Sequence, residues 1–292
     1  MIPDHLDQLM MHFQPPRSLS ELLLKVLFIP ALLASTAFGV PVISSISGNS
    51  NTNGGGTLTL AGTGFGASGA FVTIGGLPAP VLSQIDTQIE CFAPPGQGTV
   101  SVVVTAVPFA SDPKDFTYNA PSITTLSPSN GPTTGGIPLT ISGASFGTTD
   151  LTVTVGGVSA AVTSQIHTQI TCTLPPGQGS NLPVVVTVSG QSSAPDTFSY
   201  DPPFITSVEA PSGKPTSGGV TIELKGTNLG TSGASLSLGG NPVSLSSQAD
   251  TSITFTLPSG QGTTLPLFLL VSGQSANPVF FSYDAPAISS FT

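Results

Sequence analysis

The chain has 292 residues, of which 7% are charged, and its formal net charge is -9 with only five Lys and Arg residues. So few charged side chains leave few candidates for acid–base catalysis, and five cations cannot form the basic surface that binds a nucleic-acid backbone. The composition therefore argues against an enzyme and against nucleic acid as a partner.

Residues 1–40 differ from the rest of the chain because they contain an apolar stretch, "SLSELLLKVLFIPALLASTAFG" at 18–39. Ser18 and Glu21 have the spacing of a capping box, which predicts a helix over residues 19–29 that ends at Pro30. Lys25 and Pro30 make the stretch too short to cross a bilayer, so we expect no transmembrane span. It is either a signal peptide that is cleaved near Ala37 or a retained segment that docks on another molecule.

From residue 41 onward the sequence repeats. "PVISSIS" at 41, "PSITTLS" at 121, "PFITSVE" at 203 and "PAISSFT" at 286 lie roughly 80 residues apart, a spacing typical of small independent domains. We therefore predict an N-terminal segment at 1–40, three domains at 41–120, 121–202 and 203–285, and a single C-terminal strand at 286–292.

Each repeat has the pattern of an all-β unit. Apolar and polar residues alternate at 56–62, 137–143 and 220–226, and a Gly-Gly pair then joins two apolar runs, which predicts a hairpin. A nearly continuous apolar run follows at 100–106, 182–190 and 265–273. The closing "DFTY", "TFSY" and "FFSY" are expected to place Phe and Tyr on alternate sides. About seven short strands in each unit predict an immunoglobulin-like β-sandwich.

The repeat resembles a known family most clearly in its second copy. "PSITTLSPSNGPTTGGIPLTISGASFG", "VTVGGVSAAV", "ITCTLPPGQG" and the closing "FSY" are similar to the IPT/TIG domain, and the resemblance covers residues 41–285. It implies an immunoglobulin-like fold that binds proteins, DNA or glycans, or that acts as a spacer. Family members often bridge the cysteine of the "ITC" strand to a second one in the same domain, and that second cysteine is missing here.

The two cysteines occupy one position of the repeat. Cys91 and Cys172 align with Phe255 of the third copy, so we expect both to be buried apolar side chains without a redox or metal role. Equivalent positions of successive domains are too far apart for a disulfide.

Polar side chains at two repeated positions are the other candidates for chemistry. His167 aligns with Asp86 and Asp250 in the motif "SQI-x-TQI", which is better explained as a polar turn than as a catalytic base. The linker residues Asn119 and Asp201 align with Asp284. One carboxylate per linker is too few for a calcium site, so we predict no metal and no cofactor.

Two functions fit these features, and both place the protein outside the cell or on its surface. The first is a structural subunit of an extracellular filament that polymerises with itself head-to-tail through its terminal segments. The second is a secreted or cell-surface adhesion module that binds a protein or glycan partner. The assembly interface expected for the filament consists of apolar terminal side chains: Leu22, Leu23, Leu24, Val26, Leu27, Phe28, Ile29, Ala287, Ile288 and Phe291.

Overall fold

The computed structural model describes residues 39–287, which fold into three β-sandwiches. The predicted all-β fold with three tandem immunoglobulin-like domains is confirmed. The helix predicted within residues 19–29 lies outside the described residues. The same holds for the predicted interface side chains at 22–29, and for Ile288 and Phe291.

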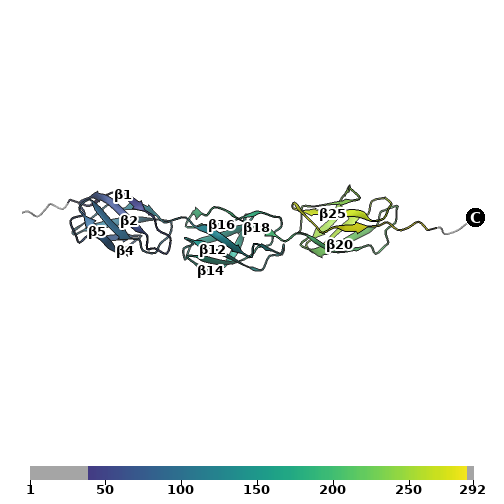
Figure 1. Ribbon diagram of the computed structural model, residues 1–292, viewed down its shortest axis with the longest axis horizontal. Helices are drawn as coiled ribbons and strands as arrows, with labels where there is room; N and C mark the ends of the chain where they lie inside the picture. Colours follow the sequence, from purple (N-terminus) through teal and green to yellow (C-terminus); the bar gives the residue numbers. More distant parts are fainter. Residues whose placement is uncertain (1–38, 288–292) are drawn as a thin grey trace, which may run out of the picture.

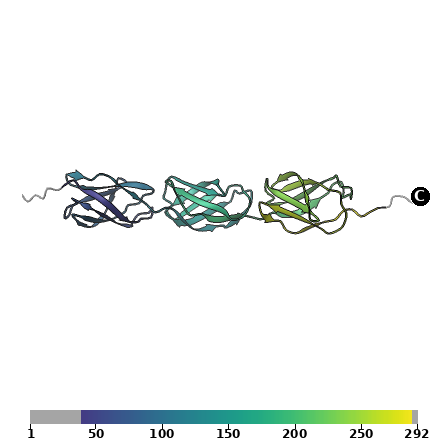
Figure 2. The same ribbon diagram turned by 90° about the horizontal axis from the view of Figure 1, so that it is seen from above.

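The three sandwiches follow one another along a single axis (Figure 1). A view from above shows the same row, with the described ends of the chain at opposite extremes (Figure 2). Each connection is one short linker, so the elongated shape depends on how each domain contacts the next.

Domain 1 has two antiparallel sheets with the strand orders β1-β2-β6-β5 and β4-β3-β7-β8, and β9 also pairs with β7. Its strands are β1 (Val42–Gly48), β2 (Thr57–Thr63), β3 (Phe71–Ile74), β4 (Leu77–Ala79), β5 (Val81–Ile85), β6 (Gln88–Phe92), β7 (Thr99–Ala106), β8 (Phe109–Ala110) and β9 (Lys114–Thr117).

Domain 2 joins its two halves into one sheet because β14 pairs with β13 through residues 158–160 and with β15 through residues 161–166. Its strands are β10 (Ser122–Ser127), β11 (Asn130–Gly131), β12 (Pro138–Ala144), β13 (Leu151–Val155), β14 (Val158–Ile166), β15 (Gln169–Thr173), β16 (Leu182–Val188), β17 (Gln191–Ser192) and β18 (Asp196–Tyr200). In domain 1 the equivalent stretch is divided into β4 and β5, with Pro80 between them.

Domain 3 has two sheets again, with the orders β19-β20-β24-β23 and β22-β21-β25-β26, and β27 also pairs with β25. Its strands are β19 (Phe204–Glu209), β20 (Thr221–Thr227), β21 (Ala234–Leu238), β22 (Asn241–Val243), β23 (Leu245–Ala249), β24 (Ser252–Thr256), β25 (Leu265–Val271), β26 (Gln274–Ser275) and β27 (Val279–Phe281).

Each sandwich encloses its own apolar core, built from the inward positions of the alternating strands. Cys91, Cys172 and Phe255 are completely buried in these cores, which confirms the interpretation of the cysteines as apolar core residues. Burial raises the pKa of each thiol from 9.0 to about 11, because an apolar environment disfavours the thiolate.

The closing Phe–Tyr pairs do not face alternate sides, and this prediction is wrong. Phe116 and Tyr118 are both buried, with ring centroids 5.1 Å apart and ring planes at 72°. The residues are two positions apart, and side chains in a strand return to the same face every second residue. The same edge-to-face pair recurs at Phe198 and Tyr200 and in domain 3.

Candidate functional site: the two domain junctions

The described residues contain no group of three or more His, Cys, Asp or Glu side chains that could hold a metal ion. The same part of the chain has no helix that is long and apolar enough to span a membrane. With both thiols buried and their pKa raised, neither cysteine is a nucleophile at neutral pH. The polar contacts with a clear spatial pattern lie elsewhere, where one domain meets the next.

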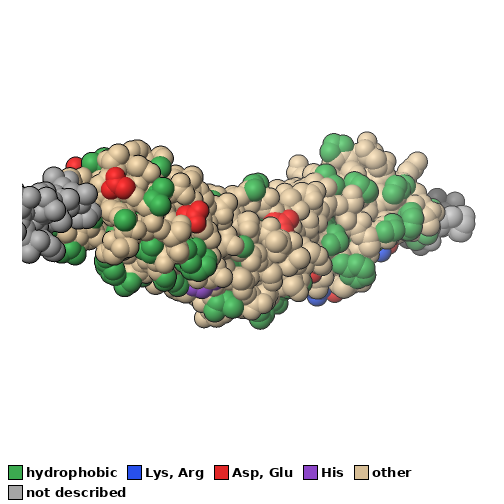
Figure 3. All heavy atoms as spheres, turned by 60° about the vertical axis from the view of Figure 1, so that its left-hand side comes forward, with side chains coloured by type: hydrophobic (Ala, Val, Ile, Leu, Met, Phe, Trp, Pro, Cys, Tyr) green, Lys and Arg blue, Asp and Glu red, His purple; other side chains and the backbone are tan. Residues whose placement is uncertain are grey.

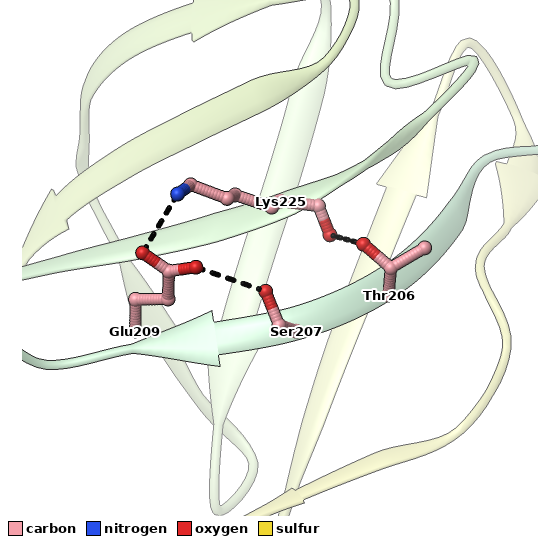
Figure 4. A network of polar contacts seen from close by, with 4 residues as sticks. All are labelled: Thr206, Ser207, Glu209 and Lys225. Carbon is pink, nitrogen blue, oxygen red and sulfur yellow. Dashed lines mark hydrogen bonds and ion pairs between the residues drawn. The ribbon is translucent and has the colours of Figure 1, made fainter.

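Domain 3 carries an exposed charged network on strands β19 and β20 (Figure 4). Lys225 Nζ lies 2.8 Å from Glu209 Oε2, and the Ser207 hydroxyl donates a hydrogen bond to the other carboxylate oxygen of Glu209. The Thr206 hydroxyl donates to the carbonyl of Lys225. The hydrogen bond and charge of Glu209 raise the pKa of Lys225. These contacts join two paired strands on an open surface and form no site that could bind a ligand.

At the first junction, the side chain of Gln97 reaches from domain 1 into domain 2. Its amide nitrogen donates to the carbonyl oxygen of Thr149 at 2.8 Å and to the hydroxyl of Ser189 at 2.8 Å. Its carbonyl oxygen accepts the backbone N–H of Thr148 at 3.2 Å. One glutamine thus makes three hydrogen bonds to the next domain.

Thr52 makes the second group of contacts at this junction and is only 1% exposed. Its hydroxyl oxygen accepts the backbone N–H of Gly147 at 3.0 Å and lies 2.8 Å from His167 Nδ1. In the opposite direction, the amide of Gln191 in domain 2 donates to the carbonyl of Tyr118 at 3.2 Å. His167 therefore lies in a turn, as predicted, and also contacts the neighbouring domain.

The second junction repeats this arrangement with the equivalent residues. Gln178 donates to the carbonyl of Ser232 at 2.8 Å and to the hydroxyl of Ser272 at 2.6 Å, and it accepts the N–H of Thr231 at 3.1 Å. The amide of Gln274 donates back to the carbonyl of Tyr200 at 2.8 Å.

Thr133 takes the position of Thr52 at the second junction and is 6% exposed. Its backbone N–H donates to Asn228 Oδ1 at 3.2 Å, and its hydroxyl donates to the carboxylate of Asp250. We refer to Gln97 and Gln178 as the junction glutamines and to Thr52 and Thr133 as the junction threonines.

The repeated "PGQG" loop explains why a glutamine projects at this point. A Cβ atom on Gly96 would lie 2.5 Å from the ring of Tyr118, and the Tyr118 hydroxyl donates to the carbonyl of Pro94 at 2.7 Å. A Cβ atom on Gly98 would lie 2.9 Å from the Cβ of Ser189 in domain 2. The first glycine packs the loop on its own tyrosine and the second lets the next domain approach, so Gln97 points across the junction.

The linker residues tie each domain to its own loop. The backbone N–H groups of Asn119, Asp201 and Asp284 donate to the carbonyls of Ser50, Gly131 and Lys214. The side chain of Asn119 donates to Asn51, and that of Asp201 accepts from Asn130. Each linker is therefore held by hydrogen bonds, and its carboxylates are not gathered into a metal site.

Aliphatic side chains are exposed along the sandwich edges of domains 1 and 2. Leu77, Val81 and Ile85 lie on β4 and β5, and Ile85 is 59% exposed. Three equivalent residues of β14 are exposed in the same way: Val158, Val162 and Ile166. Hydrophobic side chains form several separate clusters on the face shown in Figure 3, with few charged groups between them. Domain 3 has Asn241, Leu245 and Ala249 at these positions, so it lacks this row of three exposed aliphatic side chains.

Comparison with known proteins gives the family. The model of the IPT/TIG domain matches residues 41–118, 121–200 and 203–283. The chain belongs to the IPT/TIG domain family. The resemblance seen in the repeat motifs is thereby confirmed, and all three copies are members in their own right.

Two relatives are similar over much of the chain. Human Fibrocystin-L is 28% identical over 202 residues, which are 68% of this chain and 5% of that protein. Mouse Fibrocystin-L is 26% identical over 255 residues, which are 83% of this chain and 6% of that protein. The chain thus corresponds to a small part of these relatives.

Solved structures that resemble this IPT/TIG chain include the extracellular region of plexin A4, with 19% identity, 86% of this chain and 26% of that chain covered, and a TM-score of 0.30. A surface glycan-binding protein from Prevotella bryantii has 14% identity and a TM-score of 0.41, and the match covers 56% of this chain and 42% of that chain. Similarity of this degree assigns no function to this chain.

The junction glutamines and threonines were not among the residues singled out in the sequence. The available signal was the recurrence, in every copy, of "GQG" and of a threonine two positions before a Gly-Gly pair. The predicted interface residue Ala287 is exposed, and no described contact tests its role.

Proposed function

We propose that this chain is a stiff, extended binding arm of an extracellular or cell-surface protein, and that its sandwich edges contact a protein partner. The observation that carries the proposal is the pair of junctions, at which equivalent residues make the same side-chain bridges from one domain to the next. A tandem array that needed only flexible spacing would have no use for two matched sets of contacts.

The number of these bonds supports stiffness. Each junction has at least five side-chain hydrogen bonds between domains, and a hydrogen bond in a protein contributes about 0.5–1.5 kcal/mol net. Even at the low end, the sum is about 2–3 kcal/mol, and about 1.4 kcal/mol shifts an equilibrium tenfold. The docked arrangement should therefore dominate over bent ones.

The exposed edges of domains 1 and 2 suit a protein partner. On the side away from β6, β5 has no strand partner in the described chain, so its backbone N–H and C=O groups are open to an added strand. Leu77, Val81 and Ile85 supply apolar contact beside it. An extended peptide that adds to such an edge gains both main-chain hydrogen bonds and side-chain contacts.

A glycan partner has less support from the described residues. The chain contains no Trp, and all three tyrosines are buried against their own domains. The aromatic side chains with polar tips that could contact a sugar from the surface are therefore used in packing.

Head-to-tail polymerisation into a filament remains a prediction. Its expected interface lies at residues 22–29 and 287–291, and only Ala287 is among the described residues. No contact described in the three domains supports it.

Small-angle X-ray scattering of the full chain, with sedimentation velocity on the same samples, tests the proposal. We expect an elongated monomer whose longest dimension does not change with concentration. A compact or strongly flexible monomer would refute the stiff arm, and species that grow with concentration would favour the filament. Antibody labelling of intact and permeabilised source cells tests the location.

The binding edge needs a separate test. A phage library of random ten-residue peptides, selected on the full chain, should yield extended sequences with alternating apolar residues. Ile85→Lys should reduce their binding, and Ala249→Lys, at the equivalent position of domain 3, should not. Equal binding to both variants would remove the edge from the proposal.

A further inference from the structure

The face of domain 3 that lies opposite its junction with domain 2 carries the same residues that bind the next domain at both junctions. Gln261 aligns with the junction glutamines, and Thr216 aligns with the junction threonines. The loop beneath them is also the same, because a Cβ atom on Gly260 would lie 2.6 Å from the hydroxyl of Tyr283, which donates to the carbonyl of Pro258.

The residues on this face of domain 3 differ from the equivalent junction residues in their exposure to solvent. Thr216 is exposed, whereas Thr52 and Thr133 are buried. Gln261 is likewise exposed, and its side chain makes no hydrogen bond to any residue that the structure describes, whereas each junction glutamine makes three. Gly262 is exposed too, although Gly98 and Gly179 are buried.

We propose that this face of domain 3, built from Thr216, Gln261 and Gly262, is a docking surface for one further IPT/TIG domain. The occupant is defined by the chemistry of the receiving faces at the two junctions. It has a serine and a glutamine in the order Ser-Gly-Gln, as at Ser189 and Ser272, and a backbone N–H that can donate to Gln261.

The receiving face of domain 1 does not have this chemistry. Val107 and Phe109 stand where domains 2 and 3 have the serine and glutamine, and they are 78% and 44% exposed. Neither side chain can bond to Gln261 or to the carbonyl of Tyr283. Domain 1 of a second copy is therefore not the occupant, and this surface does not lead to head-to-tail polymerisation of identical chains.

Disulfide trapping in extended chains tests the assignment. In one extended chain, residues 286–292 are replaced by a second copy of domain 3 (203–285). In a matched chain they are replaced by a copy of domain 1 (41–120). Either copy then follows Ala285 directly. The first chain carries Gly262→Cys in its original domain 3 and Ser272→Cys in the appended copy. The second carries Gly262→Cys with Val107→Cys in its appended copy.

The natural second junction is the positive control. A Cβ atom on Gly179 would lie 3.6 Å from the Cβ of Ser272, which is within the range of a disulfide. The full chain with Gly179→Cys and Ser272→Cys should therefore oxidise readily. Gly179 and Gly262 have similar φ angles of +102° and +116°, so the strain of a cysteine is matched. Cys91 and Cys172 are buried and do not compete.

We expect the chain with the appended domain 3 to form its disulfide at a rate close to that of the control. The appended domain 1 should react about tenfold or more slowly, because a tethered pair that is not docked has only the effective concentration of its linker. Adding Gln261→Ala and Thr216→Ala should slow the first chain to the rate of the second. Circular dichroism of every chain establishes that the appended domain is folded.

Two results would overturn the proposal. If both appended domains react slowly, the face does not dock a domain of this family. If both react as fast as the control, the glutamine of the occupant, which is the residue that still differs between the two appended domains, does not select it, and the assigned chemistry is wrong.

Discussion

Replacing Gln178 by alanine tests whether the junction glutamines hold the domains together. The substitution removes two donated bonds, to Ser232 and Ser272, and the bond accepted from the Thr231 N–H. At about 0.5–1 kcal/mol for each partly exposed bond, the lost contact amounts to about 1.5–3 kcal/mol. Gln261→Ala is the matched control, because it truncates the same residue in the same loop where no neighbour domain is described.

Amide hydrogen exchange at Thr231 gives a direct readout, because this N–H has Gln178 as its partner across the junction. Since about 1.4 kcal/mol corresponds to a factor of ten, exchange at Thr231 should accelerate about 10- to 100-fold in Gln178→Ala. Amides in the core of domain 3, such as that of Leu269, should keep their protection, because the domain itself remains folded.

The same two variants can be compared by small-angle scattering. Gln178→Ala should broaden the distribution of longest distances, while Gln261→Ala should match the unaltered chain. If Thr231 exchanges at the same rate in both variants, the glutamine contributes no coupling and the stiffness must come from the linkers alone.

The remaining predictions concern the interior of the domains. Gly177→Ala should destabilise domain 2 by about 1–3 kcal/mol in urea unfolding, because the new Cβ would lie 2.5 Å from the Tyr200 ring. Gly39→Ala is the control and should have no effect, because a Cβ atom there would have no atom within 4 Å. Tyr200→Phe should lower the free energy of unfolding by about 1 kcal/mol and lower the Tm, because the buried hydroxyl donates to the carbonyl of Pro175 at 2.6 Å. An unchanged Tm would show that this hydrogen bond does not contribute to stability. Burial raises the pKa of Cys91 and Cys172 to about 11, so their contribution to stability is complete below pH 9 and is lost as the pH rises from 9 to 11. In urea titrations at alkaline pH, domains 1 and 2 should therefore lose more stability than domain 3, which has phenylalanine at this position. An equal loss of stability in all three domains would contradict this prediction.

Much of the fold could be predicted because it depends on local patterns. Alternating strands, Gly-Gly turns and the alignment of Cys91 with Phe255 each report the environment of a residue within its own domain. The error at Phe116 and Tyr118 was one of register, since residues two apart share a face.

The junctions could not be predicted in the same way. Gln97 and Thr52 are polar residues in a loop, and such residues are ordinary at a surface. Their function depends on Ser189 and Gly147, which are more than 90 residues away in the sequence and belong to another domain. In the sequence, only the recurrence of the motif in each repeat distinguishes this loop from an ordinary surface turn.

The two junctions differ in whether the threonine hydroxyl accepts a loop N–H of the next domain, and residue 167 accounts for the difference. In domains 1 and 3, Asp86 and Asp250 accept a backbone N–H from the loop of their own domain. Domain 2 has His167 instead of the aspartate, and the equivalent N–H, that of Gly147, donates to the hydroxyl of Thr52. Thr133 can donate its own hydroxyl proton to Asp250 because the aspartate already accepts the loop N–H.

This difference predicts a rescue. Thr52→Val keeps the shape of a buried side chain but removes the acceptor of the Gly147 N–H, and a buried donor without a partner costs about 1–3 kcal/mol. His167→Asp in the same chain should recover most of that loss in urea unfolding, because the new carboxylate can accept the N–H within domain 2, as Asp250 does in domain 3. Thr216→Val, at the equivalent exposed position, should be neutral. If His167→Asp fails to recover stability, the loop N–H does not need an acceptor and the contact of Thr52 is incidental to the junction.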